Sequence, residues 1–226
     1  MDPIISLLNE IIKKNLPAIN SKIQEGIRQR HLDPMHHVAS GDEGLGHINL
    51  GICTAFAKAG YHVKDLTGLS SLSISSLVIV NGGTNPDNPE EVCGKVQFEA
   101  KLGSSINASV GGKVTAGCGF IHPSIGISGK VSASDVVTTA KGSFNADING
   151  AKICLSQINL SQLSVNYGNT SVSIDGLGIF NTFLKPLEDF ILNIFKGQIR
   201  SAIASALTPV INTEVEKLLP LCGDLP

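Results

Sequence analysis

The C-terminal part of the chain carries a helical pattern of apolar residues without a break in phase. From Gly176 to Pro220, apolar side chains recur every three or four positions, the spacing that places them on one face of a helix. Pro186 fits the first turn of a helix that starts near Thr182, and Pro209 is expected to kink it. The pattern therefore predicts one long, curved amphipathic helix.

A band of small residues interrupts the middle of this predicted helix. The band consists of Gly197, Ser201, Ala202, Ala204, Ser205 and Ala206. Small side chains either let a neighbouring element approach closely or leave space beside the helix. Both interpretations, close packing and a cavity, remain open at this point.

A second helical pattern covers residues 3–30 at the other end of the chain. Its apolar face carries Ile4, Leu8, Ile12, Leu16, Ile19, Ile23 and Ile27. Charged residues occupy the opposite face, and Pro17 is expected to bend the helix. Amphipathic helices are therefore expected at both ends of the chain.

Between the two helices, from Gly46 to Asp175, the hydrophobic period changes to two, which indicates strands. The expected strands are 48–56, 72–80, 95–102, 106–115, 125–137, 142–148, 152–160, 163–167 and 170–174. The expected turns are Gly82-Gly83, Gly111-Gly112, Asn149-Gly150 and Gly168-Asn169. Together these segments predict an antiparallel meander.

The alternation gives the sheet one apolar face, which the two amphipathic helices are expected to cover. Glycines within the strands favour a strongly bent sheet. We therefore predict an α+β fold in which a strongly curved antiparallel sheet wraps around the long C-terminal helix, with an N-terminal amphipathic helix. No segment resembles a linker, so residues 1–226 are expected to form a single domain.

Composition narrows the classes of partner. Of the 226 residues, 42% are hydrophobic and 16% charged, and the formal net charge is -2. Nucleic-acid binding needs clustered Lys and Arg, so it is not expected. Charged residues interrupt every apolar run before it reaches the roughly 18 residues of a membrane span.

The five cysteines leave at least one thiol outside an intramolecular disulfide. Cys93 and Cys118 flank an expected hairpin whose turn lies near Gly103, and they form the preferred pair. The sequence does not assign Cys53, Cys154 or Cys222, and none of the five lies in a C-x-x-C motif. Metal and redox roles are not expected from them.

The chain lacks the short motifs of common enzymes. No G-x-S-x-G, H-E-x-x-H, intact phosphate loop or dinucleotide fingerprint occurs. His31, His36 and His37 fall in an expected loop, where imidazoles can meet a metal but are usually solvated. We expect a non-enzyme with no catalytic residue, no metal site and no catalytic cofactor.

Secretion is the expected localisation. The chain passes from Met1 directly into the helical pattern without a basic segment or a small-residue cleavage site, so we interpret Met1 as an initiator added to a mature sequence. Sequons at Asn107, Asn159 and Asn169 and the five cysteines are compatible with an extracellular protein.

Four segments carry a resemblance to a known group of proteins. They are the LDPM segment from Leu32, HINLGI from His47, HVKDLTGLSSLSISSLVIV from His62, and GLGIFNTFLKPLEDFILNIFKGQIRSAIASALTPV from Gly176. The sequence resembles the group 7 mite allergens and their insect homologues. More distantly it is similar to the takeout and juvenile-hormone-binding proteins and to the bactericidal/permeability-increasing half-module of the tubular lipid-binding superfamily.

The resemblance implies an antiparallel sheet rolled around a long C-terminal helix, with a lipophilic tunnel or groove between them. It also implies a hydrophobic ligand and secretion. The takeout and juvenile-hormone-binding proteins carry a cysteine pair near the N-terminus, whereas residues 1–30 contain no cysteine. This departure favours a relationship to the group 7 branch, and it argues against juvenile hormone as the ligand.

We therefore expect a carrier for an elongated apolar molecule such as a terpenoid, another isoprenoid, a carotenoid or a fatty acid. The residues expected to line its site are Leu8, Ile12, Ile19, Ile23, Phe56, Phe98, Phe144, Leu187, Ile191, Phe195, Ile199 and Ile203. The alternative for each of them is an ordinary place in a packed core. The alternatives for the protein are a surface-active or bacterial-lipid-recognising protein with transient membrane contact, and an allergen-like structural protein without a fixed ligand.

Overall fold

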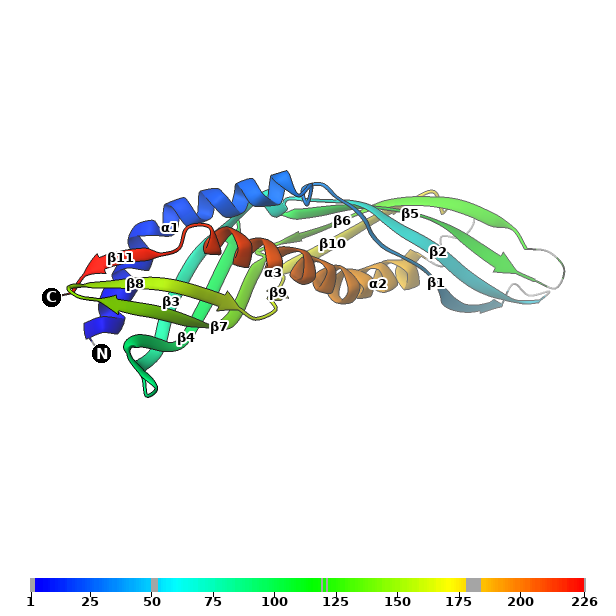
Figure 1. Cartoon of the computed structure of the whole chain (residues 1–226). Coiled ribbons are helices and arrows are strands. Elements are labelled where there is room, and N and C mark those ends of the chain that lie inside the picture. The colour runs from blue at the N-terminus through cyan, green and yellow to red at the C-terminus, as the bar shows by residue number, and fades with distance from the viewer. Residues whose placement is uncertain (1–2, 50–52, 119, 121, 178–183, 226) are drawn as a thin grey trace.

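The computed structural model describes residues 3–49, 53–118, 120, 122–177 and 184–225. The molecule is elongated, and both ends of the chain lie at the same end of it (Figure 1). Its helices are α1 (Pro3–Gln29), the short 3-10 helix η1 (Leu69–Ser71), α2 (Leu184–Ile194), the π-helical segment η3 (Phe195–Ile199) and α3 (Arg200–Glu216). Its strands are β1 (Met35–Asn49), β2 (Thr54–Thr67), β3 (Leu72–Asn85), β4 (Asn88–Leu102), β5 (Ile106–Gly117), β6 (Ser124–Ser134), β7 (Val137–Asn149), β8 (Lys152–Leu160), β9 (Ser164–Asn166), β10 (Asn169–Asp175) and β11 (Leu221–Asp224).

The two long helices confirm the helical patterns of the sequence. α1 buries Ile5, Leu8, Ile11, Ile12, Ile19, Ile23 and Ile27. In the C-terminal helix, α2, η3 and α3 follow one another without a gap, and Pro209 lies inside α3 without ending it. Pro186 lies in the first turn of α2, and Thr182 is outside the described residues. The departure from α-helical geometry is η3, ahead of Pro209 in the chain.

The strands form two curved antiparallel sheets, which confirms the expected fold class (Figure 1). Sheet A has the strand order β1-β2-β5-β6-β10, and sheet B has the order β11-β8-β7-β4-β3, with β9 also paired to β7. A simple meander was therefore the wrong topology. The chain leaves sheet A after β2, forms the β3–β4 hairpin of sheet B, and returns to pair β5 with β2.

Several expected boundaries were also wrong. The expected strand 48–56 is the end of β1 and the start of β2, and the expected strand 125–137 divides at Asp135, which has a positive φ of 52°. Gly82-Gly83 and Gly111-Gly112 lie inside strands rather than in turns. Position 112 of β5 requires a glycine because a side chain there would overlap the backbone oxygen of Gly60 in the neighbouring strand β2.

The expected disulfide between Cys93 and Cys118 is wrong. Cys118 pairs with Cys53, Cys154 pairs with Cys222, and Cys93 is a free thiol. The reason is topological: Cys93 lies in β4 of sheet B, whereas Cys118 follows β5 of sheet A. The chain crosses between the sheets where the sequence suggested a hairpin turn.

Side-chain amides of the helices cover the edges of sheet B. Asn9 of α1 donates to the backbone oxygen of Ile79 (3.1 Å) and accepts from the nitrogen of the same residue (2.8 Å). Asn20 forms the same pair of bonds with Ile74 in β3, at 3.3 and 2.6 Å. Each asparagine thereby takes the place of a neighbouring strand on the edge of β3.

The C-terminal helix repeats this arrangement on the other side of sheet B. Asn212 of α3 donates to the oxygen of Leu160 (3.0 Å) and accepts from its nitrogen (2.9 Å). The hydroxyl oxygen of Thr208 accepts from the nitrogen of Leu163 (3.1 Å). Helices α1 and α3 are thus fixed to opposite margins of the same sheet, with their apolar faces turned inward.

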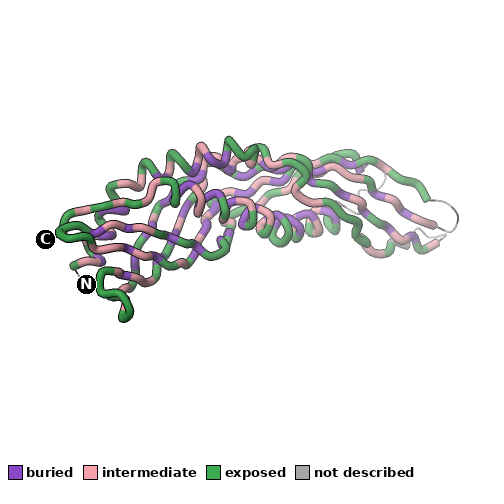
Figure 2. The backbone as a smooth tube through the Cα atoms, in the orientation of Figure 1, coloured by how far each residue is buried: buried purple, intermediate pink, exposed green. Residues whose placement is uncertain are grey.

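The hydrophobic core extends along the molecule rather than filling a sphere. One cluster joins inward-facing residues of both sheets to the apolar stripes of α1 and of the C-terminal helix. Figure 2 shows buried residues along these helices and alternating along the strands. The fold therefore places an elongated apolar interior beside the long helix.

Candidate ligand-binding interior

The C-terminal helix presents its predicted lining residues to the interior. Leu187, Ile191, Phe195, Ile199 and Ile203 are between 0 and 3% exposed. They come from α2, η3 and α3 in succession, so the apolar stripe continues through the π-helical segment. This stripe runs from Leu187 to Ile203 along one face of the C-terminal helix.

The predicted residues of the other elements mostly face the same interior. Leu8, Ile12, Ile19 and Ile23 of α1 are at most 1% exposed. Phe98 of β4 and Phe144 of β7 are 2% and 1% exposed. The structure thus brings two helices and sheet B together around these side chains, and whether they contact a ligand stays a prediction.

Phe56 does not belong to this set. Its neighbours Ala55 and Ala57 are buried, so the period of two turns Phe56 to the outer face of sheet A. There its ring lies 5.1 Å from the ring of His47, and the Lys58 ammonium lies 5.6 Å from its centroid. The prediction of Phe56 as a lining residue was wrong. It assumed that an aromatic side chain in a strand faces the interior, whereas the inward positions here are the small residues Ala55 and Ala57.

The position of the small-residue band does not agree with the interpretation that it borders a cavity. Gly197, Ser201 and Ser205 are exposed, and a side chain at Gly197 would meet no atom within 4 Å. Ala204 alone among the six band residues is buried. The band therefore faces mainly outward and does not mark space between the helix and the sheets.

Polar side chains lie at the margin of the apolar interior near the π-helical segment. The hydroxyl of Tyr61 in β2 donates to the side-chain oxygen of Gln198 at 3.2 Å. Tyr167, between β9 and β10, lies with its ring 5.2 Å from the ring of Phe195 and 5.2 Å from the guanidinium carbon of Arg200. Burial raises the pKa of Tyr167 to about 12, with the positive charge of Arg200 acting in the opposite direction.

The sequence pattern missed Tyr167 and Arg200. A tyrosine at the end of a short strand and an arginine in an amphipathic helix both suggest surface positions. The π-helical turn comes immediately before Arg200 and has no signature in the spacing of the apolar residues. The signal that could have indicated a special site is therefore visible only in the structure.

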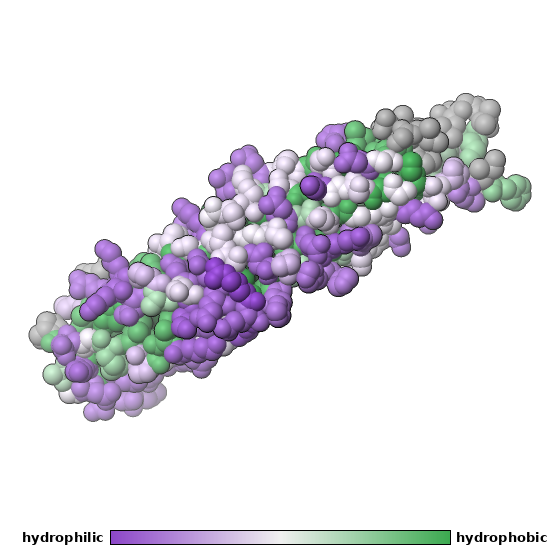
Figure 3. Space-filling model, turned by 90° about the horizontal axis from the view of Figure 1, so that it is seen from above, coloured by the Kyte–Doolittle hydropathy of each residue, from purple (hydrophilic) through white to green (hydrophobic). Residues whose placement is uncertain are grey.

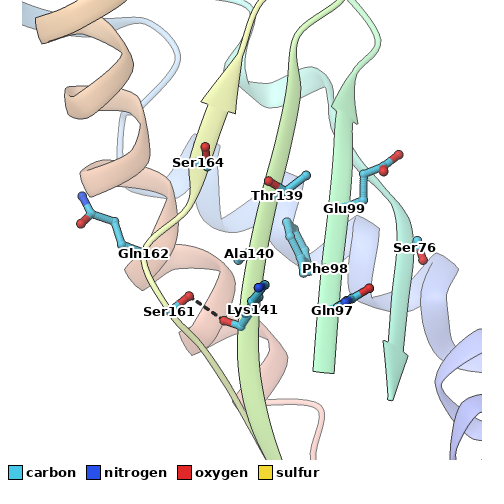
Figure 4. Close-up of a pocket in the computed structure, with 10 residues that line it drawn as sticks. All are labelled: Ser76, Gln97, Phe98, Glu99, Thr139, Ala140, Lys141, Ser161, Gln162 and Ser164. Carbon is cyan, nitrogen blue, oxygen red and sulfur yellow. Dashed lines mark hydrogen bonds between the residues drawn. The ribbon is translucent and has the colours of Figure 1, made fainter. Parts of the chain in front are cut away.

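Hollows also lie on the outer faces of the sheets. One, of about 440 Å³, lies at β4 and β7, and its lining includes Gln97, Glu99 and Lys141 (Figure 4). Another, of about 760 Å³, lies beside the free Cys93 and contains Gly94 and Gly142. Both are lined by outward-facing polar residues as well as apolar atoms, so they differ from the interior.

The described residues contain neither a metal-binding cluster nor a helix that could span a membrane. No group of three or more His, Cys, Asp or Glu side chains within them is placed to hold a metal ion. His36 and His37 lie in β1 rather than in the expected loop, and Nδ1 of His36 is 2.7 Å from a carboxylate oxygen of Asp65. None of the described helices has the length and apolar character needed to cross a bilayer.

The chain was compared with known proteins. No protein-family model matches it, and no curated protein sequence matches it. Among solved structures it is similar to Takeout 1 of Epiphyas postvittana, with 13% identity, a TM-score of 0.41, and coverage of 95% of this chain and 93% of that chain.

It is also similar to a lipopolysaccharide binding protein, with 14% identity and a TM-score of 0.31. That match covers 94% of this chain and 37% of the other, so the chain spans just over a third of that protein's length. Independently of these scores, the two curved antiparallel sheets, α1 and the long C-terminal helix form the architecture that the sequence resemblance implies for the tubular lipid-binding superfamily.

Proposed function

We propose that this protein binds and carries an elongated hydrophobic small molecule in its apolar interior and that it is not an enzyme. The observation that carries the proposal is the buried stripe from Leu187 to Ile203, which faces the apolar sides of the sheets. A stripe of this length suits an extended ligand better than a compact one. Terpenoids and other isoprenoids, carotenoids and fatty acids have the required shape.

The energetics of such binding follow from burial. Removing apolar surface from water contributes about 25 cal/mol per Å², and an extended hydrocarbon chain is almost entirely apolar. The lining side chains are nearly inaccessible to water, so a ligand among them would be shielded along its length. Binding would then need few polar contacts, which agrees with the mainly apolar lining.

Secretion is part of the same proposal. The Cys53–Cys118 and Cys154–Cys222 disulfides suit an oxidising compartment. A carrier outside the cell would protect an apolar molecule from water during transport.

The direct test is to extract the purified protein with organic solvent and to identify the extract by mass spectrometry. Recovery of one lipophile in near-stoichiometric amount is expected, and absorbance in the visible range would distinguish a carotenoid from a fatty acid. Ile199→Phe should lower the recovery by filling the interior, whereas Ser201→Phe on the exposed side of the same helix should not. An empty extract, together with no saturable binding of an apolar dye, would contradict the proposal.

A second candidate function is contact with a lipid surface. Phe120, in the connection between β5 and β6, has a relative exposure of 105%. Figure 3 shows one face of the molecule with hydrophobic side chains visible towards both ends. An exposed phenylalanine at the end of a long molecule can enter the interfacial region of a bilayer.

Vesicle co-sedimentation separates this candidate from the carrier. If the surface contact exists, Phe120→Ser should reduce the fraction of protein that sediments with anionic vesicles. Val78→Ser, at a position 38% exposed on the outer face of β3, serves as the control. Equal sedimentation of both variants and the unchanged protein would leave the carrier as the function to pursue.

A further inference from the structure

Two hydrogen-bond donors are buried beside the C-terminal helix without an acceptor. The hydroxyl of Tyr167 and Nε of Arg200 are inaccessible to water, and no oxygen of the described residues accepts a hydrogen bond from either. The Arg200 guanidinium lies close enough to the tyrosine oxygen to lower the pKa of the phenol, but it is a donor and leaves the phenol proton without an acceptor. Buried polar groups in folded proteins are almost always paired, so each unpaired group calls for an explanation. The two groups also belong to side chains that contact each other, since the Arg200 guanidinium carbon lies 5.2 Å from the centre of the Tyr167 ring.

The π-helical segment sets the position of this pair. η3 ends at Ile199, and Arg200 is the next residue in the chain. Phe195, the first residue of η3, lies against the same tyrosine ring at 5.2 Å. π-helical turns cost stability and recur at functional sites, so the segment is a second and independent indication of a site here.

The charge of Arg200 is not balanced by a neighbouring carboxylate. Among the described residues, Asp and Glu side chains pair with Lys22, Arg30, His36, Lys101, Lys185 and Lys217, and none pairs with Arg200. The tyrosine hydroxyl is protonated at neutral pH, as an ordinary phenol is, and burial raises its pKa further, to about 12. The missing partner is therefore an acceptor and, beside an arginine, preferably an anion.

We infer that Tyr167 and Arg200 bind the carboxylate headgroup of an amphipathic lipid whose tail lies along the apolar stripe. This inference rests on the proposed carrier function and narrows its ligand class to fatty acids and related acidic lipids. One carboxylate oxygen would accept from the Tyr167 hydroxyl and the other from Nε of Arg200. The tail would then lie against Phe195, Ile199 and Ile203, which are buried on the same helix, and Phe195 contacts the Tyr167 ring.

The inference is tested with two probes of equal chain length. Palmitate and cetyl alcohol are each titrated against the solvent-extracted protein in competition with an apolar dye. Palmitate is expected to bind about tenfold more tightly, because hydrogen bonds to a charged group contribute more than those to a neutral hydroxyl. Tyr167→Phe and Arg200→Gln should each remove most of this preference, because they weaken the binding of palmitate much more than the binding of cetyl alcohol.

A matched variant excludes a general effect of charge. Lys196→Gln removes an exposed cation from the same part of the helix and should keep the preference for palmitate. An equal loss in Lys196→Gln would show that the preference arises from long-range attraction, which overturns the headgroup site.

The remaining outcomes separate the two proposals. If the unchanged protein binds both probes equally, the headgroup site is wrong, water satisfies the two donors, and the carrier function stands. If it binds neither probe, the carrier function itself is contradicted for ligands of this class. The comparison of the two probes on the unchanged protein needs no variant, so it decides the matter even if Arg200→Gln fails to fold.

Discussion

At the scale of single residues, the burial of Tyr167 links folding to alkaline pH. The folded protein holds the phenol proton up to a pKa of about 12, whereas the reference value of a free tyrosine is 10.0. Between these values the unfolded chain binds fewer protons than the folded one, so the free energy of unfolding falls as pH rises. The loss for this partly buried group should be roughly 2 kcal/mol over that window.

Urea denaturation of the extracted protein at pH values on either side of that window measures the effect. Lysine titration contributes to both proteins, so the relevant quantity is the difference between the unchanged protein and Tyr167→Phe. The variant should lose less stability on going to alkaline pH. Parallel losses in the two proteins would mean that Tyr167 ionises equally well in both states.

Gly94 illustrates a second constraint at the residue scale, the close approach of two backbones. A methyl group at this position of β4 would overlap the backbone oxygen of Asn81 in β3. Gly94→Ala must therefore displace a strand, and we expect a loss of about 1–3 kcal/mol in the free energy of unfolding. Gly83→Ala in the same hairpin meets nothing within 4 Å and should change it by less than about 0.5 kcal/mol. Equal losses in the two variants, measured by urea denaturation, would argue against this steric origin.

At the scale of elements, the amide bonds between helix and strand replace a missing strand neighbour. Asn20→Asp keeps the shape of the side chain but removes the donor to the oxygen of Ile74. A carboxylate beside that carbonyl oxygen is repelled, so the free energy of unfolding should fall by about 1–3 kcal/mol.

Asn15→Asp is the control for Asn20→Asp. Asn15 is half-buried on the same helix, but its amide bonds only the oxygen of Ile11 within α1, at 2.8 Å. Asn15→Asp should therefore lower the free energy of unfolding, measured by urea denaturation, clearly less than Asn20→Asp does.

The same elements show what a sequence pattern can predict. Both helices were predictable because a 27-residue helix such as α1 repeats its apolar spacing over many turns. The strands were located, but not their order, because a period of two fixes which face is buried and says nothing about which strand pairs with which. The Cys93–Cys118 pairing was wrong for this reason.

The candidate site was predictable to the same degree. The burial of Leu187, Ile191 and Phe195 follows from their helical spacing. The prediction for Phe56 was wrong because an aromatic side chain does not by itself indicate which face of a strand is buried, and here the inward positions are the neighbouring alanines. The contact between Tyr167 and Arg200 could not be predicted from the sequence, because it depends on a π-helical turn and on the packing of two segments that are distant in the chain.

At the scale of the whole molecule, the two sheets share one core through the C-terminal helix. α2 lies beside β10 of sheet A, and α3 lies beside β8 and β9 of sheet B, so the helix joins the two halves. The main hydrophobic cluster contains residues of both sheets. If the C-terminal helix moved away from its place, the apolar faces of both sheets would be exposed to water.

This shared core predicts that the two halves unfold together, and the absence of tryptophan from the chain makes the prediction easy to test. Val80→Trp, at a position 46% exposed in β3, reports on sheet B, and Ser109→Trp, at an exposed position of β5, reports on sheet A. The urea midpoints of the two proteins should coincide with each other and with that of the circular dichroism signal, as in a two-state transition. A lower midpoint for the sheet A reporter would show that the half around α2 opens by itself. A bound lipid that lies along the helix should then raise that lower midpoint more than the other, because it would contact the part of the interior that opens first.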